Sequence, residues 1–209
     1  MLSISSFKTK PGLPQALSGG FTLVEMMVVI AIMLIITGVV LSNLPNFRDR
    51  LSLDLIAQEV AITIRQAQVF GSGTRTSGAN AFPSYGVYFD TAHSDNFILF
   101  ADLGTPNDRY DAIAGCQEIG NECREQFNFT RGVQLVDLQS CISGACTSIG
   151  GNILNVAFRR PLTDAIFSTA ATQLATDVSH VIIKIAKTSK IDDTRSIVVW
   201  NTGHIYVIR

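Results

Sequence analysis

The chain has 209 residues, of which 47% are hydrophobic and 16% are charged, and its mean hydropathy is +0.30. This composition excludes an intrinsically disordered chain, because such chains are rich in charge and poor in apolar residues. Sixteen Lys and Arg against 17 Asp and Glu give a net charge of -1. A generic nucleic-acid-binding domain is therefore not expected, since it needs a basic excess to hold the phosphate backbone.

One apolar segment, residues 21–44, is long enough to cross a bilayer as a helix, which takes about 20 residues. No second segment of this kind is present, so a multi-span membrane protein is excluded. Lys8 and Lys10 precede the segment, and no acidic residue accompanies them. The positive-inside tendency then places the N-terminus in the cytoplasm and the rest of the chain outside.

Two simpler interpretations of this segment fit it less well. A secretory signal peptide has its apolar core directly after its positive charges, with a small-x-small cleavage site behind it. Here prolines and glycines separate the lysines from the core, and Ser-Asn-Leu-Pro follows it at 42–45. A plain membrane anchor accounts for the length. It leaves Glu25 unexplained unless the carboxylate lies at the interface, because an acid within a membrane segment is costly.

The start of the segment resembles the N-terminus of type IV prepilins and pseudopilins, through the sequence Gly19-Gly20-Phe21-Thr22-Leu23-Val24-Glu25. The resemblance implies that a prepilin peptidase cleaves between Gly20 and Phe21 and that the new amine of Phe21 is N-methylated. It also implies that Glu25 guides subunit assembly by pairing with the Phe21 amine of a neighbouring subunit. Because two unpaired buried ions are costly, this pair would set the assembly register.

An amphipathic helix is expected to follow, since apolar residues recur at steps of three and four, at Leu53, Ile56, Val60, Ile64 and Ala67. Gly71-Ser72-Gly73 ends it, and Pro45 is expected to kink or briefly interrupt it. The sequence therefore predicts a leader peptide at 1–20 and one long helix at 21–70. Within that helix, 21–44 is the membrane or filament-core part and 45–70 is the amphipathic part.

A β-rich globular head is predicted for residues 71–209. Short runs of aromatic and β-branched residues indicate strands at 85–89, 96–100, 126–129, 132–138, 153–158, 180–186, 195–200 and 204–208. The clearest hairpin turn is Asn201-Thr202-Gly203. The whole predicts an α+β, pilin-like fold in which a long N-terminal helix packs on a mostly antiparallel sheet. The order of elements in the head is similar to that of minor pseudopilins of the GspH/FimT type.

The four cysteines are candidates for disulfides, because the head is expected outside the cytoplasm. Four cysteines allow three pairings. The local pairs Cys116–Cys123 and Cys141–Cys146 are favoured, and the crossed pairings stay open. A zinc site is the alternative, but the sequence offers neither Cys-x-x-Cys spacing nor a histidine nearby along the chain.

Oxygen-bearing side chains cluster in one turn, at Asp102, Asn107, Asp108 and Asp111. Calcium takes six to eight oxygen ligands from loops of this kind. The resemblance to pseudopilins points the same way, because some major pseudopilins bind calcium in the head. The turn lacks a bidentate glutamate at its far end, and Asp and Asn are also common in solvated turns. A calcium site and a solvated turn both remain open, and no other cofactor is expected.

No catalytic motif is evident. The sequence has no Gly-x-Ser-x-Gly motif and no phosphate-binding loop, and its three histidines, His93, His180 and His204, are widely separated. An anchored extracytoplasmic hydrolase is therefore not expected.

The resemblance instead implies a structural subunit of a type IV pilus or a type II secretion pseudopilus, and it favours a minor subunit over a major one. Its partners would be the prepilin peptidase, other pilin subunits and the membrane. The alternative is a fibre-tip module that recognises DNA, a surface or an exported protein. The net charge argues against DNA binding by the head as a whole, and leaves Arg159-Arg160 as a local basic pair.

Overall fold

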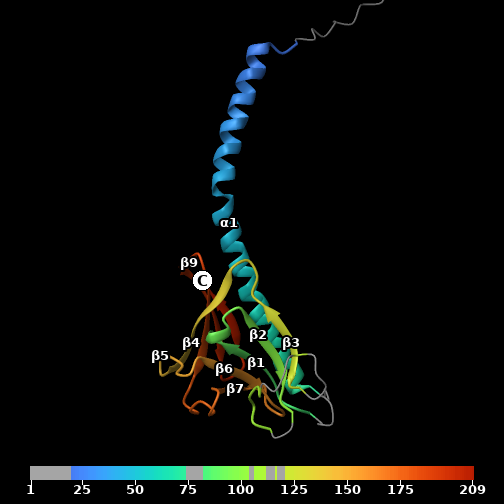
Figure 1. Cartoon of the computed structure of the whole chain (residues 1–209), viewed down its shortest axis with the longest axis vertical. Coiled ribbons are helices and arrows are strands. Elements are labelled where there is room, and N and C mark those ends of the chain that lie inside the picture. Colours follow the sequence, from blue (N-terminus) through green and yellow to red (C-terminus); the bar gives the residue numbers. More distant parts are fainter. Residues whose placement is uncertain (1–19, 74–81, 104–105, 112–115, 117–120) are drawn as a thin grey trace, which may run out of the picture. The chain divides into compact units, whose positions relative to one another are not determined.

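A computed structural model of the chain describes residues 20–73, 82–103, 106–111, 116 and 121–209 (Figure 1). All but the last residue of the predicted leader lies outside these ranges. The chain divides into two compact units, Met1–Pro45 and Asn46–Arg209. The helix α1 (Leu23–Ser72) supplies residues to both units. It starts and ends two residues later than predicted, and it continues through Pro45 without the expected interruption.

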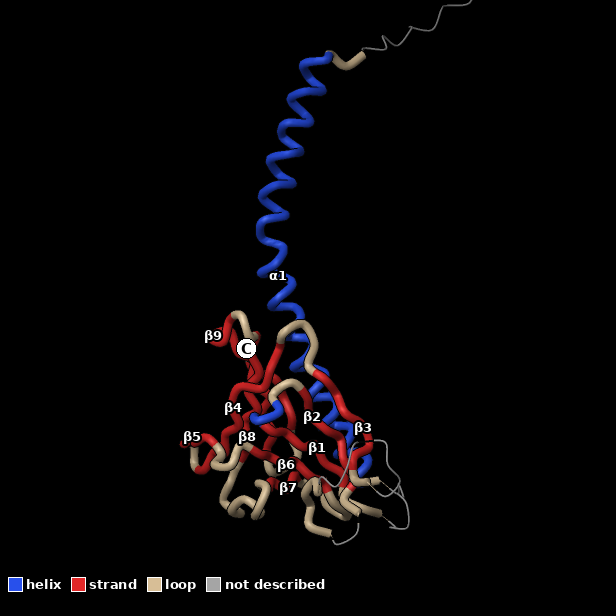
Figure 2. Tube along the Cα trace, viewed as in Figure 1, coloured by secondary structure: helices blue, strands red, loops and turns tan. Residues whose placement is uncertain are grey.

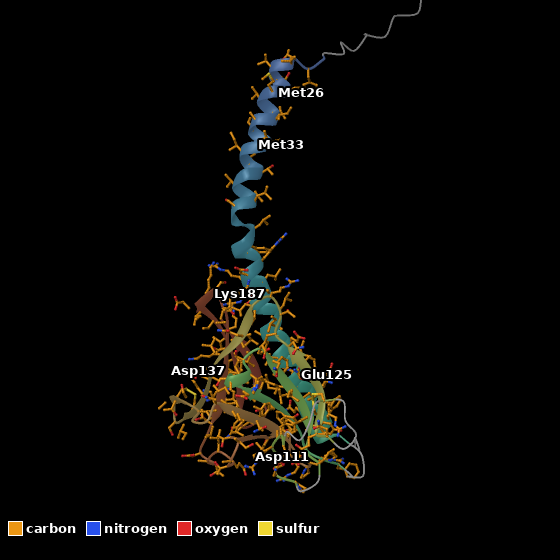
Figure 3. The ribbon with its side chains drawn as sticks, in the orientation of Figure 1. Met26, Met33, Asp111, Glu125, Asp137 and Lys187 are labelled. Atoms are coloured by element: carbon orange, nitrogen blue, oxygen red, sulfur yellow. A yellow bond between two sulfur atoms is a disulfide. The ribbon has the colours of Figure 1, made fainter. Side chains whose placement is uncertain are left out.

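In the first unit α1 is apolar around its whole circumference. Leu23–Ser42 is 20 residues long with a mean hydropathy of 2.8, so its length and composition suffice to cross a membrane. All of its side chains that the structure describes are exposed. Figure 3 shows Met26 and Met33 projecting from this part of the helix. A helix that is hydrophobic all round requires an apolar environment on every side.

In the second unit the remainder of α1 buries one face against the strands. The buried apolar side chains on this face are Leu53, Ile56, Ala57, Val60, Ala61, Ile64 and Ala67. Their spacing matches the predicted apolar stripe, which is confirmed. The stripe joins the hydrophobic core, whose largest fully buried members include Phe89, Phe97 and Phe158.

Within the described residues, ten strands form two five-stranded sheets in which every pairing is antiparallel (Figures 1 and 2). The first sheet has the order β3-β2-β1-β6-β7, with β1 (Tyr85–Asp90), β2 (Asn96–Ala101), β3 (Cys123–Asn128), β6 (Ile153–Phe158) and β7 (Ala165–Ser168). The short helix η1 (Thr91–His93) joins β1 to β2. The second sheet has the order β10-β9-β8-β4-β5, with β4 (Val133–Ile142), β5 (Ala145–Ser148), β8 (His180–Lys187), β9 (Lys190–Trp200) and β10 (Ile205–Ile208).

The predicted α+β, pilin-like fold is confirmed, but the strands form two sheets where one was expected. The closing hairpin turns at Gly203, whose φ of +80° is the left-handed conformation that glycine tolerates. Two strands were missed by sequence, β5 and β7. All four residues of β5 are exposed, so no alternation of apolar residues marks it, and its pairing with β4 alone defines it.

The outermost strands of both sheets are short. β5, β7 and β10 have four residues each, and β3 has six. The pairing of β3 with β2 shifts register between Leu99 and Phe100, which marks an irregularity at that edge.

Candidate functional site

The predicted cleavage site lies immediately before α1. Gly20 and Phe21 are non-helical and exposed, and Phe21 is 75% exposed. Thr22 caps the helix: its Oγ1 accepts a hydrogen bond from the Glu25 N–H at 3.2 Å, and its carbonyl accepts from the Met26 N–H at 3.2 Å. Threonine is a favoured N-cap residue because it satisfies a backbone donor that the helix leaves unpaired.

Glu25 lies in the first turn of α1, and its side chain is exposed. Thr22 and Glu25 have the Thr-x-x-Glu spacing of a capping box, and a carboxylate near a helix N-terminus is stabilised by the helix dipole. Glu25 thus has a local reason to occupy this position, besides the assembly role that the resemblance implies. The two roles require different things of Glu25. Capping needs contacts within the first turn of α1, whereas assembly needs the negative charge to pair with a neighbouring subunit.

The structure contains the two local disulfides that the sequence favours, Cys116–Cys123 and Cys141–Cys146. Cys141 and Cys146 lie directly opposite each other on β4 and β5. His180 on β8 lies opposite Cys141 on its other side, and one of its ring nitrogens and the two sulfur atoms all lie within 4.8 Å of one another. His180 is distant from both cysteines along the chain, so the sequence did not connect them. The pairing of β4 with β8 brings His180 next to Cys141.

Two acids of the predicted turn, Asp102 and Asp108, are buried rather than solvated. Asp102 is 2% exposed, and its Oδ2 accepts hydrogen bonds from the backbone N–H of Asn107 at 2.9 Å and of Asp108 at 2.6 Å. Ser84 Oγ donates to the same oxygen at 3.2 Å. Oδ1 of Asp102 is buried without a hydrogen-bond partner among the described residues. Burial raises the pKa of Asp102, and these hydrogen bonds oppose that rise.

Asp108 is the second buried acid of the turn. Its Oδ2 lies 3.0 Å from Arg159 Nη1, and its Oδ1 is buried without a partner within the described ranges. Its backbone carbonyl accepts a hydrogen bond from Ser168 Oγ at 3.2 Å, which fastens the turn to β7. Asp111 differs from both, because it is exposed and accepts from Asn107 Nδ2 at 2.8 Å (Figure 3).

Glu122 completes this turn and was missed by sequence. It is 4% exposed, and its two carboxylate oxygens accept from the backbone N–H of Leu103 at 3.0 Å and of Asp111 at 2.6 Å. Burial raises the pKa of Glu122, again against the effect of its hydrogen bonds. The sequence did not mark it as part of the turn, because it lies eleven residues after Asp111, directly before β3.

Asp102 and Glu122 accept hydrogen bonds from backbone N–H groups of the turn, and these bonds order it. Among the described residues, the one group of three His, Cys or acidic side chains close enough to share a metal ion is Cys141, Cys146 and His180. The two unpartnered oxygens of Asp102 and Asp108 are the atoms that a calcium ion could use. Calcium binding at this turn stays a prediction.

The basic pair is occupied within the head. Arg159 pairs with Asp108, and the Arg160 guanidinium lies 4.7 Å from the centroid of the Phe82 ring. A phosphate would have to compete with both contacts. The structure therefore offers no support for DNA binding at this pair.

The histidines enter separate contacts. His93 Nδ1 lies 2.8 Å from Asp90 Oδ2, and Tyr88 donates to the same oxygen at 3.3 Å. Burial and the nearby Asp90 raise the pKa of Tyr88 to about 12, so its hydroxyl is not an activated nucleophile. His180 instead contacts the Ser179 hydroxyl at 3.0 Å.

The comparisons with known proteins bear on the N-terminal segment. Residues 16–41 match the family described as the prokaryotic N-terminal methylation motif. Searches of curated proteins and of solved structures returned no match. The matched residues contain the predicted cleavage site, the Thr22 cap and Glu25. This match, together with the apolar start of α1, supports a type IV pilin or pseudopilin that is processed by prepilin peptidase and anchored by a single N-terminal helix.

Proposed function

We propose that this chain is a subunit of a type IV pilus or a type II secretion pseudopilus. Prepilin peptidase removes residues 1–20, the Phe21 amine is methylated, and α1 carries the subunit from the membrane into a filament. The observation that supports this most strongly is the coincidence, within 16–41, of the methylation motif with a capped helix that is apolar over most of its length. The function is structural, so the subunit is expected to catalyse no reaction.

Glu25 is the residue that we assign to assembly. It is the only ionisable residue of the candidate span Leu23–Ser42, and its carboxylate is exposed near the free end of the helix. After cleavage the chain would begin with the cationic amine of Phe21. Pairing that amine with Glu25 of a neighbour would neutralise two charges that are costly to bury separately, so a subunit in the wrong register would be penalised.

The processing step is tested by mass spectrometry of the N-terminal peptide of the membrane-extracted protein. We expect a peptide that begins at methylated Phe21 in cells with prepilin peptidase and an uncleaved leader in cells without it. A leader that is uncut in both strains, or a cut beyond Leu41, would contradict the proposal.

The assembly role of Glu25 is tested with two variants that separate charge from capping. Glu25→Gln removes the charge and keeps the side-chain size, whereas Thr22→Ala removes the cap and keeps the charge. We expect Glu25→Gln to insert in the membrane normally but to be depleted at least tenfold from sheared filaments. Thr22→Ala should stay within about twofold of the wild type, since losing a cap costs only about 1 kcal/mol of helix stability. Equal incorporation of Glu25→Gln and the wild type would remove the assembly role.

We further propose that the subunit is a minor one of the GspH/FimT type. The support is the order of elements: a strand, β1, soon after the helix, and a closing hairpin of β9 and β10. Quantitative mass spectrometry of purified filaments tests this proposal. A minor subunit is expected at well below one copy per major subunit, and near-equal abundance would make it a major one.

A further inference from the structure

Cys146, Cys141 and His180 form one row across three adjacent strands of the second sheet. Cys146 on β5 pairs with Cys141 on β4, and Cys141 pairs with His180 on β8. Side chains at directly paired positions of a sheet point to the same face. The two sulfur atoms and a ring nitrogen of His180 accordingly converge to within 4.8 Å of one another.

The imidazole of His180 is held in place from two sides. Its ring stacks on the ring of Trp200, with centroids 4.6 Å apart and an interplanar angle of 25°. Its Nδ1 lies 3.0 Å from the Ser179 hydroxyl, and that hydroxyl donates its proton to the Cys141 carbonyl at 3.0 Å. Because a hydroxyl has one proton, the Ser179 oxygen is left as an acceptor for Nδ1–H.

A hydrogen bond from Nδ1–H to the Ser179 hydroxyl favours the tautomer that carries its proton on Nδ1. With the proton on Nδ1, the lone pair of a neutral His180 lies on Nε2, and a metal needs that lone pair. Metal-binding histidines usually donate their other ring N–H to a neighbouring oxygen in this way, which orients the ring. Ser179 is thus placed to orient the His180 ring through its hydroxyl, which is itself hydrogen-bonded to the Cys141 carbonyl.

The exposure of the three groups leaves room for an ion. Cys141 is fully buried, His180 is half-buried and Cys146 is exposed, so the row opens to solvent at its β5 end. Two thiolates and one imidazole are ligands that thiophilic cations such as Zn²⁺ prefer. Three protein ligands with an open fourth position would let water complete a tetrahedral shell.

We propose that, when Cys141 and Cys146 are reduced, they bind a thiophilic d¹⁰ cation such as Zn²⁺ together with His180, so that the β4–β5 hairpin has two alternative covalent states. In one state the sulfurs form the disulfide. In the other, a dithiol reductant has supplied two electrons and two protons to give two thiols and is itself oxidised to a disulfide. Metal binding then releases the two thiol protons to solvent. A chain that has not yet been oxidised enters the metal-binding state without any reductant.

The test uses the full-length chain in detergent, reduced with a phosphine and titrated with Zn²⁺ against a chromophoric chelator. We expect one Zn²⁺ per chain at this site in the reduced protein and none in the oxidised one. His180→Ala should weaken binding at least tenfold. His204→Ala is the matched control. His204 is exposed in the turn between β9 and β10, and its ring contacts Tyr206. Its replacement should leave the affinity for Zn²⁺ within twofold of the wild type.

Two further measurements identify the ligands of the bound ion. Cys116 and Cys123 are also reduced, so Cys141→Ser/Cys146→Ser should lose this Zn²⁺ whereas Cys116→Ser/Cys123→Ser should keep it. X-ray absorption should give two sulfur ligands at about 2.3 Å and nitrogen at about 2.0–2.1 Å. Bound Zn²⁺ should also slow reoxidation of Cys141 and Cys146 at least tenfold, because a metal-bound thiolate is shielded from exchange.

The proposal is overturned if the reduced chain binds no Zn²⁺ at the hairpin. It is also overturned if His180→Ala binds as tightly as the wild type, since the site would then consist of sulfur alone. Circular dichroism is recorded on each reduced protein. A reduced chain that has lost its sheet signal and does not regain it with Zn²⁺ contradicts the proposal as well, because the row of ligands requires the paired strands.

Discussion

Arg195 Nε donates a hydrogen bond to Asp54 Oδ1 at 2.5 Å, which joins β9 to the part of α1 that belongs to the second unit. The guanidinium also donates to Asp193 at 2.7 Å, and its side chain is only 8% exposed. Lys187 on β8 pairs with Asp49 one turn earlier in the helix (Figure 3). Apolar side chains alone would tolerate sliding of a helix over a sheet. Each ion pair joins one residue of α1 to one residue of a strand, so together they favour one position of the helix along the sheet.

Arg195→Ala should therefore destabilise the head. Without Arg195, Asp54 is left with the exposed Arg209, 3.4 Å away, as an ion-pair partner. We expect the free energy of unfolding to fall by roughly 2–3 kcal/mol, since Asp54 also keeps some contact with water. Denaturant unfolding of the detergent-solubilised chain measures this. Arg50→Ala is the control: its pair with Asp193 is exposed and 3.9 Å long, so it should cost less than about 1 kcal/mol. Equal losses in the two variants would contradict the assignment.

Gly71→Ala should destabilise the contact between the end of α1 and β6. An alanine Cβ at this position would lie 2.2 Å from the carbonyl oxygen of Phe158, and that oxygen belongs to a paired strand that cannot easily move. Overpacking of this kind costs about 1–3 kcal/mol. Gly150→Ala meets no atom within 4 Å and should leave the melting temperature almost unchanged. A Gly71→Ala protein as stable as the Gly150→Ala protein would show that the helix end is free to shift.

Asp102 should make the stability of the head depend on pH. Burial raises the pKa of Asp102 above its ordinary value of 3.8. At a pH between 3.8 and the raised pKa, the Asp102 carboxyl is protonated in the folded state and ionised in the unfolded state. The free energy of unfolding therefore falls as pH rises through this window. Asp102→Asn should flatten that slope, and adding Glu122→Gln should flatten it further, because burial raises the pKa of Glu122 too. A slope that both substitutions leave unchanged would refute this origin.

The same pair of proteins, wild type and Asp102→Asn, decides whether the turn binds calcium. A rise in melting temperature with millimolar calcium that is present in the wild type and absent from Asp102→Asn would support the site. Identical melting curves with and without calcium would remove the prediction.

His93 should titrate above the ordinary histidine pKa of 6.5, because the hydrogen bond and the charge of Asp90 stabilise its protonated form. The stabilisation is present below 6.5 and is lost as pH rises through the raised pKa. NMR titration of the imidazole protons measures the value directly. Asp90→Asn should bring the pKa of His93 back toward 6.5, and an unchanged value would show that another group controls it.

Sequence alone was sufficient where the signal is local. The apolar run at the start of α1 and the buried stripe on its second half each follow from residues close together in the chain. The turn at Gly203 does as well. Sequence failed where partners come from other strands. Glu122 reaches the acidic turn, and His180 reaches Cys141, only after the sheets have formed. The division into two sheets was missed for the same reason, since strand order is a property of pairing.

The edge strands β5, β7 and β10 have only four residues each, which affects how readily the sheets could pair with those of another molecule. An exposed strand edge is a template on which a second chain can add its own strand, and short or irregular edges blunt that tendency. Four residues span only about 13 Å, too little to hold a stable intermolecular ladder. The disulfide also ties β5 covalently to β4. The edges formed by β5, β7 and β10 are therefore poor templates for a strand of a second chain, and the longer β3 edge carries an irregularity instead.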